Sequence, residues 1–213
     1  MSMDALATPQ FSATEFRRRA AAQDPDHAAD AYGDHRLNPD LKHMIVRDGL
    51  HDAAVLVPVV DHREGATIIL TERSSRLRSH SGQIAFPGGR IDPTDASPEQ
   101  AALREAEEEI GLDPSLVEVV GRMPDYVTGS GYRIRPILSV VRPGFLLTLN
   151  VDEVEDAFEV PLSFLMDPAN HRRESRIWQG RERFYYTMPY GERFIWGVTA
   201  GILHMLYERL YAA

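Results

Sequence analysis

The most informative stretch of this sequence is a glycine-rich loop followed by a predicted helix with four glutamates in five positions. The stretch covers residues 88–112 and reads GGRIDPTDASPEQAALREAEEEIGL. Ser97 is suited to cap a helix and Pro98 to its first position, whereas Gly111 is suited to the left-handed conformation that ends one. We therefore predict a helix over residues 98–110.

The glutamates of this helix converge. At about 100° per residue, Glu105, Glu108 and Glu109 gather on one side, nearly opposite the apolar stripe of the helix. Like charges four residues apart destabilise a helix, so a cation is expected to neutralise them. Mg²⁺ does this while keeping several waters and bridging one or two carboxylates to substrate phosphates. A solvated acidic face is the alternative that an isolated acidic helix would favour.

The sequence around these glutamates resembles the signature of the Nudix hydrolase superfamily. Residues 104–112 (REAEEEIGL) match its second half, which is Arg-Glu-aliphatic-any-Glu-Glu-any-Gly-aliphatic, and Gly89 matches its opening glycine. Immediately upstream, residues 70–74 (LTERS) and 77–89 (LRSHSGQIAFPGG) resemble the additional signature of the coenzyme A diphosphatase branch. The resemblance therefore covers the loop, the helix and the segment before them.

The loop before the helix departs from the usual pattern by one residue. The general signature has a glutamate six residues after its glycine and eight before its arginine. Here Asp95 lies six residues after Gly89 but nine before Arg104, and Ala96 occupies the other register. The loop acid that braces Arg104 is therefore open between Asp92 and Asp95.

The resemblance implies a metal-dependent hydrolase of diphosphates and assigns roles to the acidic residues. Glu105, Glu108 and Glu109 are the expected ligands of Mg²⁺ or Mn²⁺, and Arg104 would orient the glutamates. Glu153 opens a Glu-Val-x-x-x-Phe-x-Val-Pro-Leu pattern that resembles the branch, so it is our first choice for a general base or further ligand. The alternative for this second acidic group is a solvated loop.

Basic side chains lie just before the helix, between residues 73 and 90, in a protein whose formal net charge is −9. Guanidinium groups bind phosphate oxygens in bidentate fashion, so this group could hold the phosphates of a nucleotide. Ordinary surface arginines are the alternative. Glycines permit close backbone approach to a ligand. By the resemblance, the candidate substrate contacts are Arg73, Arg78, His80, Gln83, Gly88 and Gly89.

The branch resemblance implies coenzyme A or acyl-CoA as the substrate, cleaved to 3′,5′-ADP and (acyl-)4′-phosphopantetheine. Two alternatives stay open: the same chemistry on another nucleoside diphosphate such as ADP-ribose or NADH, and a nucleotide-binding module without catalysis. The net charge argues against general affinity for nucleic acid or anionic membranes. The expected partner is thus a small-molecule nucleotide, and a homodimer is one possible assembly.

Length and composition indicate one enzyme domain with an extension. The chain has 213 residues, 43% of them hydrophobic, which suffices for a sizeable core. We expect residues 1–45 to form an N-terminal extension with a short helix and residues 46–213 to form the hydrolase domain. The sequence contains no cysteine, and we find no signal peptide or membrane span in it, so a cytoplasmic setting is the default expectation.

Apolar patterns predict the remaining elements. Residues 53–60 and 66–73 read as two strands joined as a hairpin, and further strands are expected after the glutamate helix. Residues 194–210 show apolar residues at helical spacing, which predicts an amphipathic helix packed on the sheet. These patterns support a mixed sheet with helices, and the resemblance implies an α/β fold of the Nudix type, an α/β/α sandwich with a mixed central sheet.

Overall fold

Strand β2 (His51–Val60) lies in the middle of a mixed sheet and is parallel to β8 (Tyr132–Val141) along its whole length. The structure is a computed structural model and describes residues 9–23, 32–44, 49–77 and 79–212. Within these residues the sheet has nine strands. The others are β1 (Tyr32–Gly33), β3 (Thr67–Arg73), β4 (Ile84–Ala85), β5 (Gly88–Arg90), β6 (Val117–Arg122), β7 (Tyr126–Val127) and β9 (Val154–Pro161).

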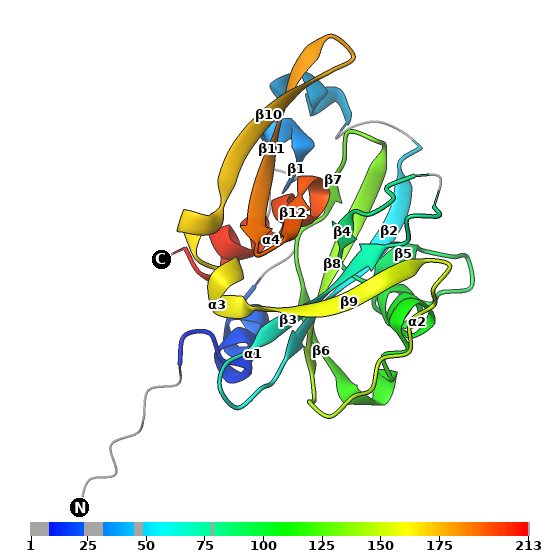
Figure 1. Cartoon of the computed structure of the whole chain (residues 1–213), viewed down its shortest axis with the longest axis vertical. Helices are drawn as coiled ribbons and strands as arrows, with labels where there is room; N and C mark the ends of the chain where they lie inside the picture. Colours follow the sequence, from blue (N-terminus) through cyan, green and yellow to red (C-terminus); the bar gives the residue numbers. More distant parts are fainter. Residues whose placement is uncertain (1–8, 24–31, 45–48, 78, 213) are drawn as a thin grey trace, which may run out of the picture.

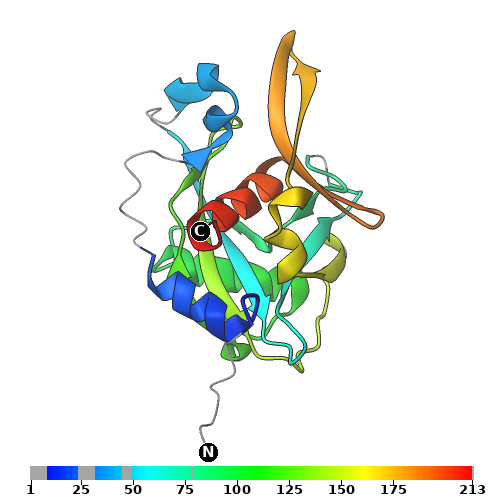
Figure 2. The ribbon, with the colours of Figure 1, turned by 90° about the vertical axis from the view of Figure 1, so that its left-hand side faces the viewer.

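Helices cover both faces of this sheet, as Figures 1 and 2 show. Helix α2 (Pro98–Ile110) lies on one face, and α1 (Ala13–Ala21) and α4 (Gly197–Leu210) lie on the other together with the short α3 (Leu162–Leu165). The expected α/β/α sandwich with a mixed central sheet is therefore confirmed. Among the described residues, none of the helices has both the length and the apolar composition of a membrane-spanning helix.

Each face of the sheet buries its own apolar cluster. On the α2 face, Ala102, Ala106 and Ile110 pack against strand residues such as Leu56 and Ile137. Ala106 and Ile110 belong to the predicted apolar stripe, whose third member, Leu103, is only partly buried. Their burial fixes the rotation of α2, so the opposite side of the helix carries the glutamates.

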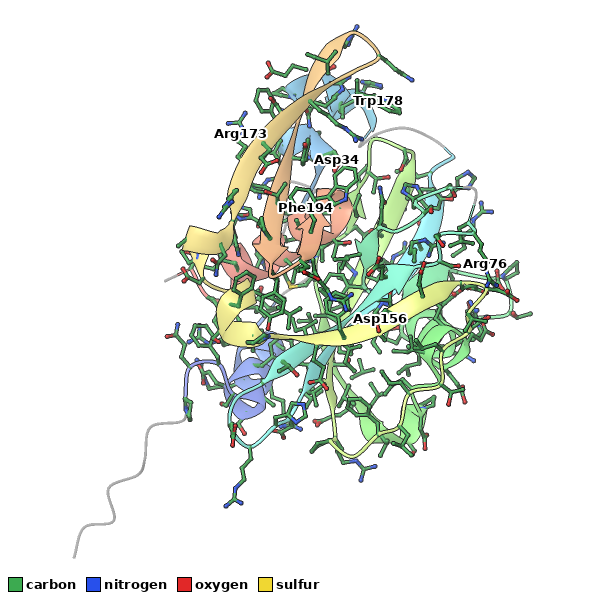
Figure 3. The ribbon with its side chains drawn as sticks, viewed as in Figure 1. Asp34, Arg76, Asp156, Arg173, Trp178 and Phe194 are labelled. Atoms are coloured by element: carbon green, nitrogen blue, oxygen red, sulfur yellow. The ribbon has the colours of Figure 1, made fainter. Side chains whose placement is uncertain are left out.

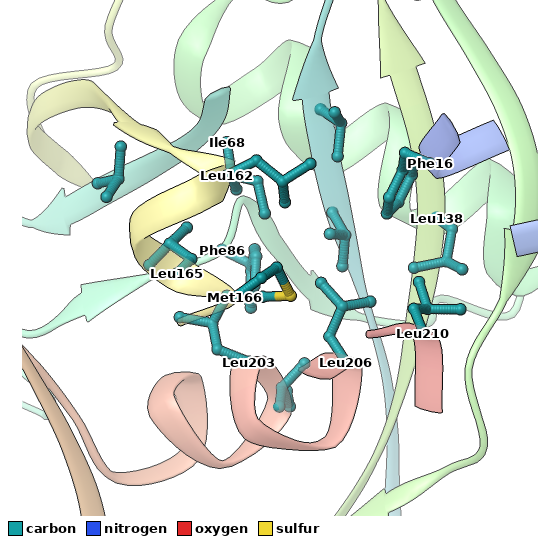
Figure 4. Packing of buried hydrophobic residues seen from close by; sticks show 14 of the residues in the cluster. Phe16, Ile68, Phe86, Leu138, Leu162, Leu165, Met166, Leu203, Leu206 and Leu210 are labelled. Carbon is teal, nitrogen blue, oxygen red and sulfur yellow. The ribbon is translucent and has the colours of Figure 1, made fainter. Parts of the chain in front are cut away.

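The cluster on the other face joins segments that are far apart in the sequence. Phe16 of α1 is fully buried and belongs to the same cluster as Leu138 of β8 and Leu206 of α4 (Figure 4). The predicted short N-terminal helix is present, with Ser12 as its cap accepting from Glu15 N–H at 3.2 Å. It is thus part of the main core.

The predicted hairpin of β2 and β3 is present only near its turn. The two strands pair at Val59–Ile68 and Val60–Thr67 and then separate. Beyond that point β5 takes the place of β3 beside β2, with Gly88 opposite Val55. This exchange brings the glycine loop next to α2.

The C-terminal part contains a second sheet, apart from the central one. β10 (Arg172–Trp178) and β11 (Arg181–Tyr190) form an antiparallel hairpin that projects beyond the sandwich (Figure 1), and β12 (Arg193–Trp196) pairs with β11. Helix α4 begins at Gly197, three residues later than predicted, because Phe194, Ile195 and Trp196 pair with β11.

The segment before β2 forms two turns of 3₁₀ helix, η1 (Asp34–Arg36) and η2 (Pro39–Met44); two further turns are η3 (Pro114–Leu116) and η4 (Pro168–Asn170). The Asn38 side chain binds β11 like a neighbouring strand: its Nδ2 donates to the Phe184 carbonyl at 3.0 Å, and its Oδ1 accepts from Phe184 N–H at 2.9 Å. The proposed boundary after residue 45 falls in the stretch 45–48, which lies outside the described residues.

Candidate active site

Helix α2 begins and ends as its sequence predicts. The Ser97 hydroxyl accepts from Gln100 N–H at 3.2 Å, and Gly111 adopts the left-handed conformation with φ 67°. Because local signals fix both ends of the helix, they also fix the positions of its glutamates along the helix axis. The predicted span of residues 98–110 is confirmed.

The glycine loop approaches this helix so closely that side chains would not fit. A Cβ atom on Gly89 would lie 2.5 Å from Cδ and Oε2 of Glu105. A Cβ atom on Gly88 would lie 2.4 Å from the carbonyl oxygen of Ala54 and 2.6 Å from Cα of Val55, and Gly88 also has φ 152°. Gly89 thus makes room for a carboxylate, whereas Gly88 makes room for the neighbouring strand.

Glu109 is the most buried of the predicted site residues, with 2% of its surface exposed. Its Oε2 accepts from Gly88 N–H at 3.1 Å, and its Oε1 lies 3.7 Å from Nη1 of Arg73. Burial raises the pKa of Glu109 to about 7, and the charges of Glu105 and Glu153 act in the same direction. The Gly88 N–H and the Arg73 charge oppose this rise but do not cancel it.

Arg104 organises the exposed part of the cluster. Its guanidinium binds Asp95 at 3.0 and 2.9 Å, Glu105 at 3.0 Å and Glu108 at 3.0 Å, whereas Asp92 lies 3.9 Å away. The side chain of Asp95 is only 2% exposed. The loop acid that braces Arg104 is therefore Asp95, the choice that the sequence left open.

The predicted acids differ in exposure. Glu105 is half-buried, and burial raises its pKa most, with Glu108 and Glu153 adding to the rise while Arg104 opposes it. The Glu108 side chain is 56% exposed. Glu153 comes from a distant turn before β9, where its Oε1 accepts from Asn150 Nδ2 at 3.3 Å. Its charge acts on both Glu105 and Glu109, so the fold brings the second acidic group to the helix.

The donor set fits a hard divalent cation. Within the described residues, no three histidine, aspartate or glutamate side chains are arranged to hold a metal ion by themselves. Mg²⁺ does not need such a cage, because it usually takes several ligands from water and substrate phosphates. Glu105, Glu109 and Glu153 supply hard oxygen donors whose mutual repulsion a cation would relieve.

Among the predicted substrate contacts, Arg73, Gly88 and Gly89 lie next to Glu105 or Glu109. His80 has φ 58°, and its Nδ1 donates to Oε1 of Gln83 at 2.8 Å. Nε of Arg73 is buried and has no hydrogen-bond partner among the described residues. Arg78 lies outside the described residues.

A cleft of about 870 Å³ begins at these side chains. The glutamates themselves do not line the cleft. They lie behind Arg73, Gly88 and Gly89, which do line it and which are next to Glu105 or Glu109. His80 and Gln83 line the same end, and α4 contributes its first residues, which have no side-chain cap. Substrate that reaches the glutamates from this cleft would pass the glycine loop.

The other walls of the cleft come from segments that the sequence reasoning missed. They are the N-terminal segment with Asp34 and Asn38, and the C-terminal sheet with Arg176, Trp178 and Trp196. Trp196 lies in the stretch 194–210 that was expected to form a helix packed on the sheet, but it is half-buried and lines the cleft. A local signal of this hairpin is Gly180, since the turn at residues 179–180 has two positive φ angles and glycine favours that conformation.

Comparison with known proteins identifies the family. The model of the NUDIX domain matches residues 50–180. A protein of Escherichia coli (strain K12), named "Uncharacterized Nudix hydrolase NudL", is 40% identical over 168 residues, which are 78% of this chain and 87% of that protein.

Two solved structures are also similar. The Nudix hydrolase RenU from M. smegmatis has a TM-score of 0.45 and 22% identity over 52% of this chain and 70% of its own. A MutT/nudix family protein from Enterococcus faecalis has a TM-score of 0.46 and 13% identity over 93% of this chain and 73% of its own. The family match and the NudL relative are the decisive ones, and they show that this chain belongs to the Nudix hydrolase family.

Proposed function

We propose that this Nudix hydrolase cleaves the diphosphate bond of coenzyme A or acyl-CoA and releases 3′,5′-ADP and (acyl-)4′-phosphopantetheine. The observation that carries the proposal is the junction of two features. Crowded carboxylates adjoin the cleft through Gly88 and Gly89, and at the same point Arg73, whose side chain is 28% exposed, lines the cleft. A diphosphate needs a cationic contact of this kind beside its hydrolytic groups.

Glu105 and Glu109 are the proposed leading ligands of Mg²⁺ or Mn²⁺, and Glu108 is a further ligand or a base. When bound there, the cation would neutralise phosphate charge and make an attacking water more acidic. Arg104 holds Glu105 and Glu108, and Asp95 holds Arg104, so these two residues position the carboxylates. Such supporting contacts usually matter for affinity and rate.

The reaction itself needs a nucleophile, a proton acceptor and a held substrate. The oxygen of water forms a bond to one phosphorus while the bond from that phosphorus to the bridging oxygen breaks, and the leaving phosphate keeps the electron pair. Glu153 is the proposed acceptor of the proton of water, since it is half-buried beside Glu105 and Glu109. Arg73 would hold a diphosphate oxygen during this step.

The test is hydrolysis of coenzyme A, dephospho-coenzyme A, ADP-ribose and NADH side by side, with Mg²⁺, with Mn²⁺ and with chelator. The proposal expects metal-dependent release of 3′,5′-ADP from coenzyme A and little turnover of the others. Preference for ADP-ribose or NADH would refute coenzyme A as the substrate but would agree with the proposed hydrolysis of a diphosphate bond. No hydrolysis of any of the four would favour a nucleotide-binding module.

A pair of variants on one helix tests the site. Glu109→Gln is expected to lower turnover more than tenfold, because it removes a proposed metal ligand. Glu107→Gln is the matched control, because Glu107 is exposed on the same helix and is not among the proposed site residues. Equal activities of the two variants would show that Glu109 has no special part in the reaction.

Three finer points belong to the same proposal. They are a cytoplasmic location, a boundary between an N-terminal extension and the hydrolase domain near residue 45, and a homodimer as the assembly. Light scattering would decide the assembly, since it gives the mass of one chain or of two. Imaging of a tagged chain in its native cell would decide the location.

A further inference from the structure

The C-terminal sheet turns one face toward the cleft, and its register decides which side chains that face carries. Alternate residues of a strand share a face, and so do residues that are directly paired across two strands. Figure 3 shows Trp178 and Arg173 on opposite sides of the hairpin. The cleft-facing set, which we term the aromatic wall, is Arg176, Trp178, Arg183, Tyr185 and Trp196.

The two arginines of the wall differ in their partners. Arg183 is paired with Asp40 of the N-terminal segment at 2.7 Å, and Asp40 also binds Arg181 at 3.0 Å. Arg176 has no carboxylate partner in the part of the chain that the structure describes. Its guanidinium carbon instead lies 4.8 Å from the ring centroid of Trp196 and 5.3 Å from that of Trp178.

The positive charge of Arg176 is therefore not neutralised by a carboxylate of the described residues and is available to an anionic ligand. Stacking on a ring uses the flat face of a guanidinium and leaves the N–H groups at its edge available for a planar anion such as phosphate. Trp178 is 54% exposed, so its side chain is accessible to a ligand. Any nucleobase can stack on such a ring, because every base has a π-face.

The wall is held in place by the N-terminal segment. Asn38 binds both backbone groups of Phe184 in β11. Asp34 fixes the segment on the other side of the cleft, where its carboxylate accepts from Gly129 N–H at 2.7 Å and from the Tyr126 hydroxyl at 3.0 Å. These contacts tie both sides of the cleft together, so the wall is preorganised.

We propose that the aromatic wall binds the nucleoside end of the substrate, with its base stacked on Trp178 or Trp196 and a ribose phosphomonoester held by Arg176. The inference rests on the proposed function, because the diphosphate must lie at the Arg73 end of the same cleft. The opposite, pantetheine end of such a substrate is uncharged and lacks an aromatic ring, so it does not match this wall.

The chain offers a direct probe, since its two tryptophans are Trp178 and Trp196 and both belong to the wall. We would titrate tryptophan fluorescence with 3′,5′-ADP and with adenosine 5′-monophosphate, in the presence of chelator. Both ligands should change the fluorescence. The 3′,5′-ADP should bind about tenfold more tightly, the usual effect of one charge-assisted contact.

Two variants of one strand then assign the extra phosphate contact. Arg176→Ala should reduce the tenfold preference for 3′,5′-ADP to about one or two. Arg173→Ala should leave it unchanged, because Arg173 lies on the strand face opposite Arg176 and does not line the cleft. Arg176→Gln, which keeps most of the side chain, gives the same comparison if the alanine variant folds poorly.

The outcomes separate this inference from the proposed function. An unchanged preference in Arg176→Ala, or wild-type fluorescence that neither ligand alters, overturns the inference even if coenzyme A is hydrolysed. A preference that disappears in Arg176→Ala supports it even if coenzyme A is not hydrolysed, in which case the proposed reaction fails alone. If both hold, Arg176→Ala should raise KM for coenzyme A about tenfold and change kcat less than threefold.

Discussion

Replacement of Gly89 by alanine tests the site with a single methyl group. The new Cβ would lie 2.5 Å from Cδ and Oε2 of Glu105 and 2.6 Å from Oε1. The backbone can accept alanine, because Gly89 is not among the residues with positive φ. The flexible carboxylate must therefore retreat by about 1 Å to reach an ordinary contact.

The size of the effect follows from that displacement. A shift of about 1 Å in a catalytic group can lower the rate about a hundredfold, or about 2.7 kcal/mol in activation free energy. The unfolding free energy should change by less than about 1 kcal/mol, since glycine to alanine at a permitted conformation is mild. We expect a folded protein with strongly reduced kcat/KM for coenzyme A.

Gly88→Ala is the contrasting variant. Its Cβ would meet the backbone of β2 at 2.4 to 2.6 Å, and its φ of 152° is unfavourable for alanine. It should lose about 2 kcal/mol or more of unfolding free energy. Urea unfolding and coenzyme A hydrolysis separate the two variants. If Gly89→Ala is folded and keeps kcat/KM within threefold of wild type, Glu105 does not act where we place it.

Four further variants test the pH dependence of stability, the bracing of Arg104 and the packing of α1. In the metal-free protein the pKa of Glu109 is about 7, against 4.5 for the ordinary side chain. Between these two pH values the folded state keeps a proton on Glu109 that the unfolded state has lost, so the unfolding free energy falls as pH rises from 4.5 through 7. Glu109→Gln should therefore gain stability relative to wild type over that range, by up to about 3 kcal/mol near pH 8, in urea unfolding with chelator. Asp95→Asn should lower kcat/KM about 10- to 100-fold and Asp92→Asn should change it little, since only Asp95 binds Arg104 closely. Phe16→Ala should lose about 3 to 5 kcal/mol of unfolding free energy in thermal or urea unfolding, because the ring is fully buried in the core.

Each of these has a clear contrary result. A stability difference between Glu109→Gln and wild type that does not vary with pH would mean that the wild-type carboxyl is not perturbed. Equal losses in the Asp95 and Asp92 variants would place the brace of Arg104 elsewhere in the loop. A loss below about 1 kcal/mol for Phe16→Ala would show that α1 is not part of the main core.

Local signals account for what the sequence predicted well. Helix α2 was predicted to the residue, because Ser97, Pro98 and Gly111 each act within one turn of the helix. The choice between Asp92 and Asp95 could not be made in the same way. It depends on a turn in which Asp95 accepts from Asp92 N–H at 2.8 Å and so points its side chain toward Arg104.

The cleft walls could not be predicted, because long-range pairing creates them. β10 reads RRESRIW, and its residues are mostly exposed, so it shows no apolar alternation that would mark a strand. It becomes a strand through its pairing with β11. Asn38 contacts Phe184 across 146 positions of the chain, and no local pattern indicates such a contact.

The two halves of the site therefore depend on different kinds of information. The glutamates and the glycine loop lie in one short stretch, and Glu109 even accepts its hydrogen bond from Gly88 of that stretch, so the reaction class can be inferred from a motif. The distal part of the cleft unites the N-terminal segment with the C-terminal sheet. Because a substrate is selected by what lies beyond its reacting bond, relatives that share the glutamate helix can differ in substrate through these two segments alone.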